Sequence, residues 1–247
     1  MLIVLIVLAG CRGKDNTGSE NKNLTIAVQA PPMIDIVEFA KAEAEKDGYT
    51  VNVMVVSDNI QYNVAVNTRE ADASFAQHRP FMEQFNRENN GTLVAIQPIY
   101  NAIVGFYSKD YSDIADIPSG ATIAIPSDPS NEARALNILA SVGLIALEEG
   151  KGLAVTTDDI VANPHQFQWL KVPLLNLSEA YHEKNVALVF NYPTYIAKLN
   201  LTTDDLLIRE ERNDDFAIQF VAREDNKDGI VPYVLRGGNI SSSMYNM

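Results

Sequence analysis

Apolar residues follow two different spacings along residues 24–104. Short apolar runs alternate with longer segments in which apolar residues recur every three or four positions. The first spacing is typical of buried strands and the second of amphipathic helices. This pattern predicts strands at 24–28, 49–56, 72–76 and 92–99, and helices at 34–46, 60–67 and 79–89. Strands that alternate with helices indicate an α/β fold built on a parallel sheet with helices on both faces.

The same alternation begins again in the second half of the chain. The predicted strands are 102–108, 121–125, 167–172, 186–190, 206–209 and 216–222; the predicted helices are 129–142, one from 156 or 157 to 161, 178–184, and one that ends near 199. Two successive α/β units predict two lobes with a cleft between them. Open α/β sheets bind ligands where the loops after their strands gather, so the cleft is the expected binding site.

The stretch Ile117–Leu136, with the sequence IPSGATIAIPSDPSNEARAL, predicts a strand, a polar loop and a helix start. Asp128 suits the N-cap position and Pro129 the first helical position. Unpaired backbone N–H groups at such a helix end can bind an anion. Asn131 and Arg134 share one helix face, and a guanidinium can hold a carboxylate through two hydrogen bonds. A capped surface helix with a solvated arginine fits the spacing equally well.

A second candidate segment, SFAQHRPF at residues 74–81, falls where the third predicted strand ends. Phe75, His78 and Phe81 together would suit an apolar or thioether side chain, because sulfur packs well on aromatic rings. The alternative is a strand end whose aromatic residues belong to the core. The segment alone favours that alternative.

Composition narrows the range of functions. The formal net charge is −13 and the pI is about 4.6. No basic stripe for nucleic acid is visible. The three histidines lie in different predicted elements without ligand spacing, so we expect no metal site. There is no phosphate-binding loop, no GxSxG elbow and no readable nucleophile–base pair. The sequence therefore predicts no catalytic residue, no cofactor and no enzymatic activity.

The N-terminus predicts a lipid anchor. Residues 1–10 read MLIVLIVLAG, a run shorter than the roughly 20 residues needed to span a bilayer. The small residues at its end fit a secretory signal, and Leu8–Cys11 resembles the bacterial lipobox, in which the cysteine is lipidated. We interpret 1–11 as signal and lipobox, and the polar segment 12–23 as a flexible tether. The alternative is a buried N-terminal strand that happens to contain Cys11.

Three long segments, SFAQHRPFMEQFN, VGFYSKD and SGATIAIPSDPSNEARAL, together with the lipobox resemble the NlpA/MetQ family of methionine-binding lipoproteins. These are substrate-binding proteins of ABC importers. The resemblance implies a type II periplasmic-binding-protein fold. Lobe 1 would comprise 24–104 and 216–247, and lobe 2 would comprise 105–215, with Phe106 and Phe216 in the hinge strands.

The resemblance also implies a ligand site and partners. Arg134 would bind the carboxylate of L-methionine with Asn131 nearby, and Phe75, His78 and Phe81 would surround its side chain. Asn191, followed by Tyr192, would contact the backbone of the amino acid. The partners would be a membrane permease with its ATPase, and the lipid on Cys11 would hold the protein at the cell membrane, facing the periplasm or the cell exterior.

Departures from the family pattern leave the ligand open. Phe75 and Phe81 stand where tyrosine is common, and Ala76 stands where an aromatic residue is common. A roomier, more apolar pocket keeps open another amino acid, a methionine-containing dipeptide or a small organic anion. An extracytoplasmic enzyme and an interaction scaffold with a vestigial cleft are the alternatives from other classes.

Overall fold

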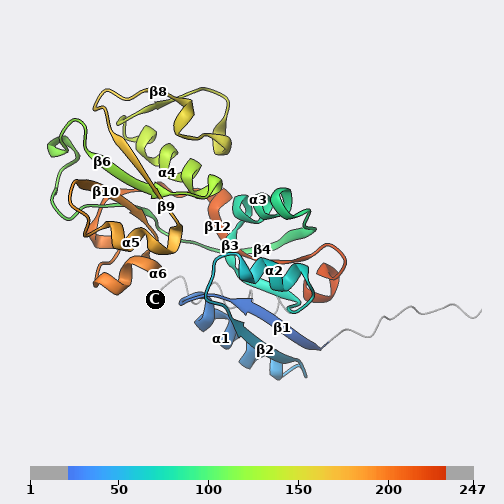
Figure 1. Ribbon diagram of the computed structural model, residues 1–247. Helices are drawn as coiled ribbons and strands as arrows, with labels where there is room; N and C mark the ends of the chain where they lie inside the picture. The colour runs from blue at the N-terminus through green and yellow to red at the C-terminus, as the bar shows by residue number, and fades with distance from the viewer. Residues whose placement is uncertain (1–21, 232–247) are drawn as a thin grey trace, which may run out of the picture.

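The computed structural model describes residues 22–231 and arranges them in two α/β lobes (Figure 1). Each lobe is built on a five-stranded sheet, and a two-stranded ribbon is attached to the second. This confirms the predicted fold class and its two-lobe architecture. The predicted signal, Cys11 and most of the tether lie outside the described residues.

The elements of lobe 1 alternate as predicted. They are β1 (Asn23–Val28), α1 (Met33–Glu45), β2 (Thr50–Val55), α2 (Gln61–Asn67), β3 (Ala73–His78), α3 (Arg79–Asn89), β4 (Leu93–Asn101) and, from the end of the chain, β12 (Ala217–Arg223). The sheet order is β2–β1–β3–β12–β4. β1 pairs in parallel with β2 and β3, whereas β12 runs antiparallel to β3 and β4. The sheet is therefore mixed and not purely parallel, because the chain returns from lobe 2 to insert β12.

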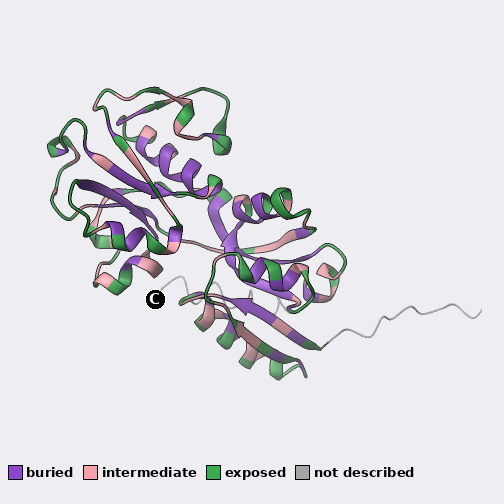
Figure 2. Cartoon of the chain, in the orientation of Figure 1, coloured by how far each residue is buried: buried purple, intermediate pink, exposed green. Residues whose placement is uncertain are grey.

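Helices cover both faces of the lobe 1 sheet. On one face Val37 and Ala40 of α1 pack with Phe75 and Phe220. On the other, helices α2 and α3 pack against the sheet through a separate apolar cluster. Figure 2 shows the central strands of both lobes as buried, with exposed residues on the outer helices and loops. Burial on both faces explains why these strands read as apolar runs.

Lobe 2 is built between the two crossings of the chain. Its elements are β5 (Gly105–Tyr107), β6 (Thr122–Pro126), α4 (Pro129–Ser141), β7 (Ala146–Leu147), β8 (Ile160–Ala162), β9 (Gln168–Val172), α5 (Leu177–Ala180), β10 (Val186–Asn191), α6 (Pro193–Ile196) and β11 (Leu206–Arg209). The sheet order is β11–β5–β10–β6–β9. β10, β6 and β9 are parallel, and β5 is antiparallel to both of its neighbours. Figure 1 shows α4 meeting α3 at the junction of the lobes.

Two predicted helices in lobe 2 were wrong in type or length. The helix predicted from 156 or 157 to 161 is a 3-10 turn at Thr157–Asp159 followed by β8. Thr156 makes the capping box that a helix start would make, but Ile160 then pairs with β7 as a strand. The sequence TTDD recurs at 202–205 with the same turn and capping box, again before a strand. The helix predicted at 178–184 ends already at Ala180.

Two crossover segments connect the lobes. Residues 102–104 lead from β4 to β5, and residues 210–216 lead from β11 back to β12. The segments are hydrogen-bonded to each other, since Glu210 N donates to Val104 O at 2.9 Å. Phe216 ends the second crossover, whereas Phe106 lies inside the core of lobe 2. The crossovers are thus positioned beside any ligand that lies between the lobes.

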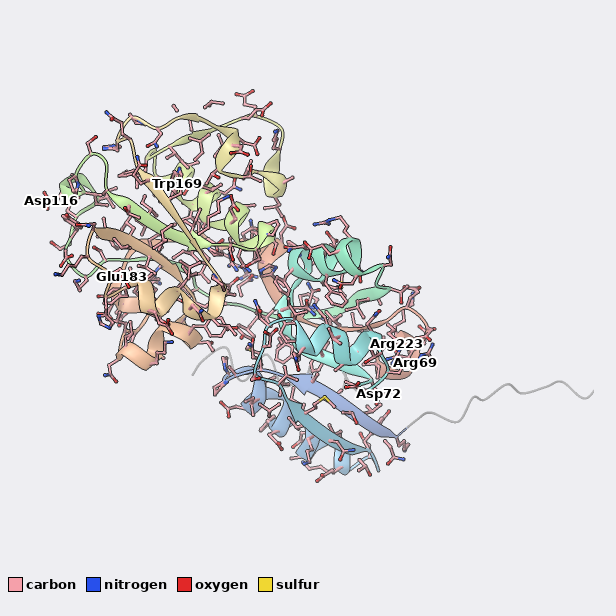
Figure 3. All side chains as sticks on the ribbon, viewed as in Figure 1. Arg69, Asp72, Asp116, Trp169, Glu183 and Arg223 are labelled. Atoms are coloured by element: carbon pink, nitrogen blue, oxygen red, sulfur yellow. The ribbon has the colours of Figure 1, made fainter. Side chains whose placement is uncertain are left out.

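Arg223 stabilises lobe 1 on the side turned away from lobe 2, where Figure 3 labels it beside Arg69. Its guanidinium donates to the backbone oxygens of Val66 and Ala71 and pairs with Asp225. Asp225 also pairs with Arg69. These contacts fasten the segment after α2 to the end of β12.

Candidate functional site

A pocket lies between the two lobes, with about 460 Å³ of empty space that is partly open to solvent. Residues of both lobes line it: Met33, Asn59, Tyr62, Ala76, Gln77, His78, Phe81, Tyr100, Ala102, Asn131, Leu174, Tyr192, Thr194, Tyr195 and Ile218. Five of these fifteen residues are phenylalanine or tyrosine, and none of the lining residues carries a formal charge when histidine is neutral.

His78 joins the lobes at the edge of the pocket. It ends β3 and is the N-cap of α3, where its Nδ1 accepts a hydrogen bond from Phe81 N at 3.2 Å. Because Nδ1 accepts, the ring proton is on Nε2, which donates to Asn131 Oδ1 of lobe 2 at 3.1 Å. The ring makes T-shaped contacts with the rings of Phe81 and Phe216. His78 therefore links the start of α3 to α4.

Burial, and secondarily the nearby charge of Arg134, lowers the pKa of His78 to about 3, against a weaker opposing effect of Asn131. The imidazole therefore stays neutral in the folded protein. The unfolded chain binds a proton near pH 6.5 that the folded chain does not bind. The contribution of the neutral His78 to the free energy of unfolding is thus fully present above pH 6.5 and is lost as the pH falls toward 3.

We expect the free energy of unfolding to include a His78 contribution that is about 2 kcal/mol smaller at pH 5 than at pH 7. Urea unfolding of the wild-type protein and of His78→Gln at both pH values isolates this contribution, because other titrating groups are common to both proteins. The pH dependence should be weaker in His78→Gln. Equal pH dependence of the two proteins would contradict a neutral, proton-excluding His78.

The N-terminus of α4 is built as the sequence predicts, but its N–H groups are already used. Asp128 is the N-cap and accepts from Asn131 N at 3.0 Å. Burial raises the pKa of Asp128, against opposing hydrogen bonds from Asn131 and Ser130. Ser130 N donates across the lobes to Gln84 Oε1 at 3.0 Å, and Glu132 N donates to Asp128 O. The prediction that free backbone N–H groups of this helix bind an anion is therefore wrong.

Arg134 is 1% exposed and has a carboxylate partner within the protein. Its Nε and Nη2 donate to Glu210 Oε1 and Oε2 at 2.8 and 2.5 Å. Nη1 donates to Tyr192 Oη at 2.8 Å, and the guanidinium lies 4.3 Å from the centre of the Phe216 ring. Burial alone lowers the pKa of Arg134, but Tyr192 and Glu210 together raise it above its ordinary value. The arginine is fully charged and lies one layer behind the pocket wall.

Tyr192 connects Arg134 to the pocket through hydrogen bonds. Its hydroxyl accepts from Arg134 and donates to Asn131 Oδ1 at 2.7 Å. Burial raises the pKa of Tyr192 to about 12, although Arg134 acts in the opposite direction. Asn131 Oδ1 thus receives hydrogen bonds from both Tyr192 and His78. These contacts form a continuous chain from β3 through α4 to the second crossover.

The structure brings together some of the predicted site residues and separates others. His78, Phe81, Asn131 and Tyr192 line the pocket. Phe75 instead stacks on Phe220 in the core of lobe 1, with ring centres 4.6 Å apart. The alternative interpretation of this segment, in which its aromatic residues belong to the core, therefore holds for Phe75. It does not hold for His78 and Phe81, which line the pocket.

Asn191 is fully buried and directly precedes Tyr192, which lines the pocket. Its Oδ1 accepts from Tyr192 N at 2.9 Å, and its Nδ2 has no hydrogen-bond partner within residues 22–231. A buried amide donor without a partner has a free-energy cost unless a ligand or water accepts from it. Its role in binding the amino acid backbone stays a prediction, as does that of Arg134.

Sequence reasoning missed several residues at the site. Tyr195 and Gln77 line the pocket, and Glu210 and Phe216 hold Arg134 behind it. The pairing of β3 with β12 skips Ala76, so side chains no longer alternate regularly between the two faces of the strand at this point. Gln77 reaches the pocket for this reason. Tyr195 is recognisable only through its cross-lobe hydrogen bond to Gln29 Oε1 at 2.9 Å.

The described part of the chain contains no group of three His, Cys, Asp or Glu side chains that could hold a metal ion. Within residues 22–231 no helix has both the length and the apolar character needed to cross a membrane.

Comparison with known proteins gives consistent matches. A sequence profile of the NlpA lipoprotein family matches residues 24–231. A lipoprotein of the YaeC family from Enterococcus faecalis V583 is 48% identical and superimposes with a TM-score of 0.79, covering 88% of this chain and 91% of that protein. A periplasmic substrate-binding protein of an ABC transporter from Coxiella burnetii is 28% identical, with a TM-score of 0.82 and coverages of 90% and 96%. A nutrient-binding protein from Burkholderia cenocepacia bound to methionine is 27% identical, with a TM-score of 0.81 and coverages of 87% and 91%.

Proposed function

Because the chain belongs to the NlpA lipoprotein family, we propose that it is a substrate-binding lipoprotein of an ABC importer that captures L-methionine, or a close relative, between its lobes. The observation that carries this proposal is the interlobe pocket, which has five phenylalanine and tyrosine rings on its wall and hydrogen-bonding groups at one end. Related structures named for an ABC transporter and for bound methionine support it.

The apolar part of the pocket suits a thioether side chain. Phe81, Tyr62 and Tyr100 present aromatic rings, and Met33 adds a flexible sulfur contact to the hydroxyl of Tyr100 at 3.0 Å. Sulfur packs favourably near the edges of aromatic rings. We place the ligand side chain on this wall, which belongs to lobe 1.

The polar end suits the backbone of an amino acid. Asn131 and Tyr192 line it, Asn191 has a spare amide donor, and Arg134 lies behind them with its charge. We place the ligand carboxylate toward this end, which belongs to lobe 2. Each lobe would then bind a different part of the same ligand, so that closure of the lobes captures it.

The protein would act without catalysis and deliver its ligand to a membrane permease driven by an ATPase. A lipid on Cys11 and the tether 12–23 would hold it at the cell membrane, facing the periplasm or the cell exterior. The lobes could then meet the permease while the chain stays anchored.

Isothermal titration tests the ligand. We expect L-methionine to bind in the micromolar range or tighter, that is, with about −8 kcal/mol or more. The panel should also contain D-methionine, methionine sulfoxide, methionine-containing dipeptides and the other amino acids. No binding tighter than about 1 mM to any of them would contradict the proposal.

The alternative on the same fold is a receptor for another amino acid, a methionine-containing dipeptide or a small organic anion. The small side chain of Ala76 on the pocket wall favours it, because it leaves room beyond a methionine side chain. Tighter binding of such a compound than of methionine in the same titrations would select this alternative. Mass spectrometry of any ligand that co-purifies gives an independent answer.

A further inference from the structure

Glu210 occupies an unusual position for a carboxylate. It is the first residue of the second crossover, and its backbone N donates to Val104 O on the first crossover. Its side chain is 11% exposed and approaches Arg134 with both oxygens. Two parallel hydrogen bonds between a guanidinium and a carboxylate are both strong and well oriented. The positive charge of Arg134, which would otherwise attract a ligand carboxylate, is therefore already balanced by Glu210.

The charges around the polar end of the pocket are few and can be assigned. Arg134 is the cation, and Glu210 and Asp128 are the nearby carboxylates. His78 is neutral because burial lowers its pKa to about 3. Two carboxylates and one guanidinium do not attract a ligand that carries only negative charge. A ligand with both a carboxylate and an ammonium group can instead place each of its charged groups near protein charge of the opposite sign.

We propose that Glu210 is a specificity-determining residue, which makes the pocket select a zwitterionic amino acid over the corresponding anion that lacks the ammonium group. This inference rests on the proposed function, in that it assigns the class of ligand to the same pocket. Glu210 acts through Arg134 and does not line the pocket. Its removal would leave the charge of Arg134 unbalanced and open the polar end to simple anions.

The test compares two ligands that differ only at one group. L-methionine is zwitterionic, and 2-hydroxy-4-(methylthio)butanoate replaces its ammonium with a hydroxyl and is a net anion. Titration of both into the wild-type protein, Glu210→Gln and Glu211→Gln gives a ratio of dissociation constants for each protein. Glu211 is the matched control, because it is adjacent, acidic and exposed. A general loss of folded protein cancels in the ratio.

We expect Glu210→Gln to reduce the preference for methionine by at least ~10-fold, and Glu211→Gln to leave it within about twofold. A second measurement does not depend on methionine. In Glu210→Ala, potassium formate should raise the Tm more than potassium chloride does, because formate can replace the missing carboxylate beside Arg134. The wild-type protein should show a smaller difference between the two salts.

An unchanged preference in Glu210→Gln would overturn the inference, as would a formate effect in Glu210→Ala no larger than in the wild-type protein. Failure of the wild-type protein to bind any compound of the titration panel would instead overturn the proposed function. In that case the formate measurement still decides whether Glu210 neutralises Arg134.

Discussion

Arg134→Ala is expected to lower the free energy of unfolding by about 3–5 kcal/mol, because removal of one partner leaves a largely buried charge uncompensated. Glu210 would lose both of its guanidinium contacts, and the hydroxyl of Tyr192 would lose a donor. Phe216 would lose the cation that lies over its ring. The second crossover, which ends at Phe216, would also lose its attachment to α4.

The same substitution is expected to weaken ligand binding by about 2–5 kcal/mol, if the ligand carboxylate lies toward Arg134 as proposed. Urea unfolding followed by circular dichroism measures the first effect, and isothermal titration under conditions where the variant is folded measures the second. Arg87→Ala is the matched control, because Arg87 is exposed on α3. A destabilised variant that binds methionine as tightly as the wild-type protein would assign Arg134 a purely structural role.

Local sequence signals predicted much of the fold, because the elements that they describe are stabilised locally. α3 begins and ends at the predicted residues 79 and 89, and α4 begins at Pro129 with Asp128 as its cap. The same kind of signal failed at 156–161, where a correct capping box precedes β8 and not a helix. A cap specifies only the first turn. The conformation of the next residues depends on their pairing with β7, a segment distant in sequence.

The candidate site was predicted in part, and the missing part consists of contacts between distant segments. His78 stood out because it lies among aromatic residues at the end of a predicted strand, and Asn131 because it shares a helix face with Arg134 near a predicted helix start. Nothing near residue 210 marks Glu210 as the partner of Arg134, which lies 76 positions earlier. Gln77 was missed for a different reason, since the slip of β3 at Ala76 changes which face its side chain meets. Long-range pairing and strand irregularities are not encoded in a local pattern.

Gly105→Ala is expected to destabilise the protein by about 3 kcal/mol or more, since overpacking against rigid backbone is among the costly core changes. Gly105 begins β5 directly after the first crossover, where it pairs with Arg209 of β11. A Cβ atom at this position would lie 1.9 Å from Ile208 O, so one of the two backbones must move. The adjacent bond from Glu210 N to Val104 O would be disturbed, and with it the placement of Glu210 beside Arg134.

Gly229→Ala is the matched control, because a Cβ atom there would have no neighbour within 4 Å and the residue does not have a positive φ angle. Urea unfolding should give a lower midpoint for Gly105→Ala and an unchanged or slightly higher midpoint for Gly229→Ala, because Gly229 is in a helical segment, where alanine is favoured over glycine. Methionine affinity should also fall in Gly105→Ala, although Gly105 does not line the pocket, because the substitution acts on the crossovers that align the two lobes. Two variants with the same midpoint would show that β5 and β11 separate at little cost, and the crossovers could not then position Glu210 rigidly.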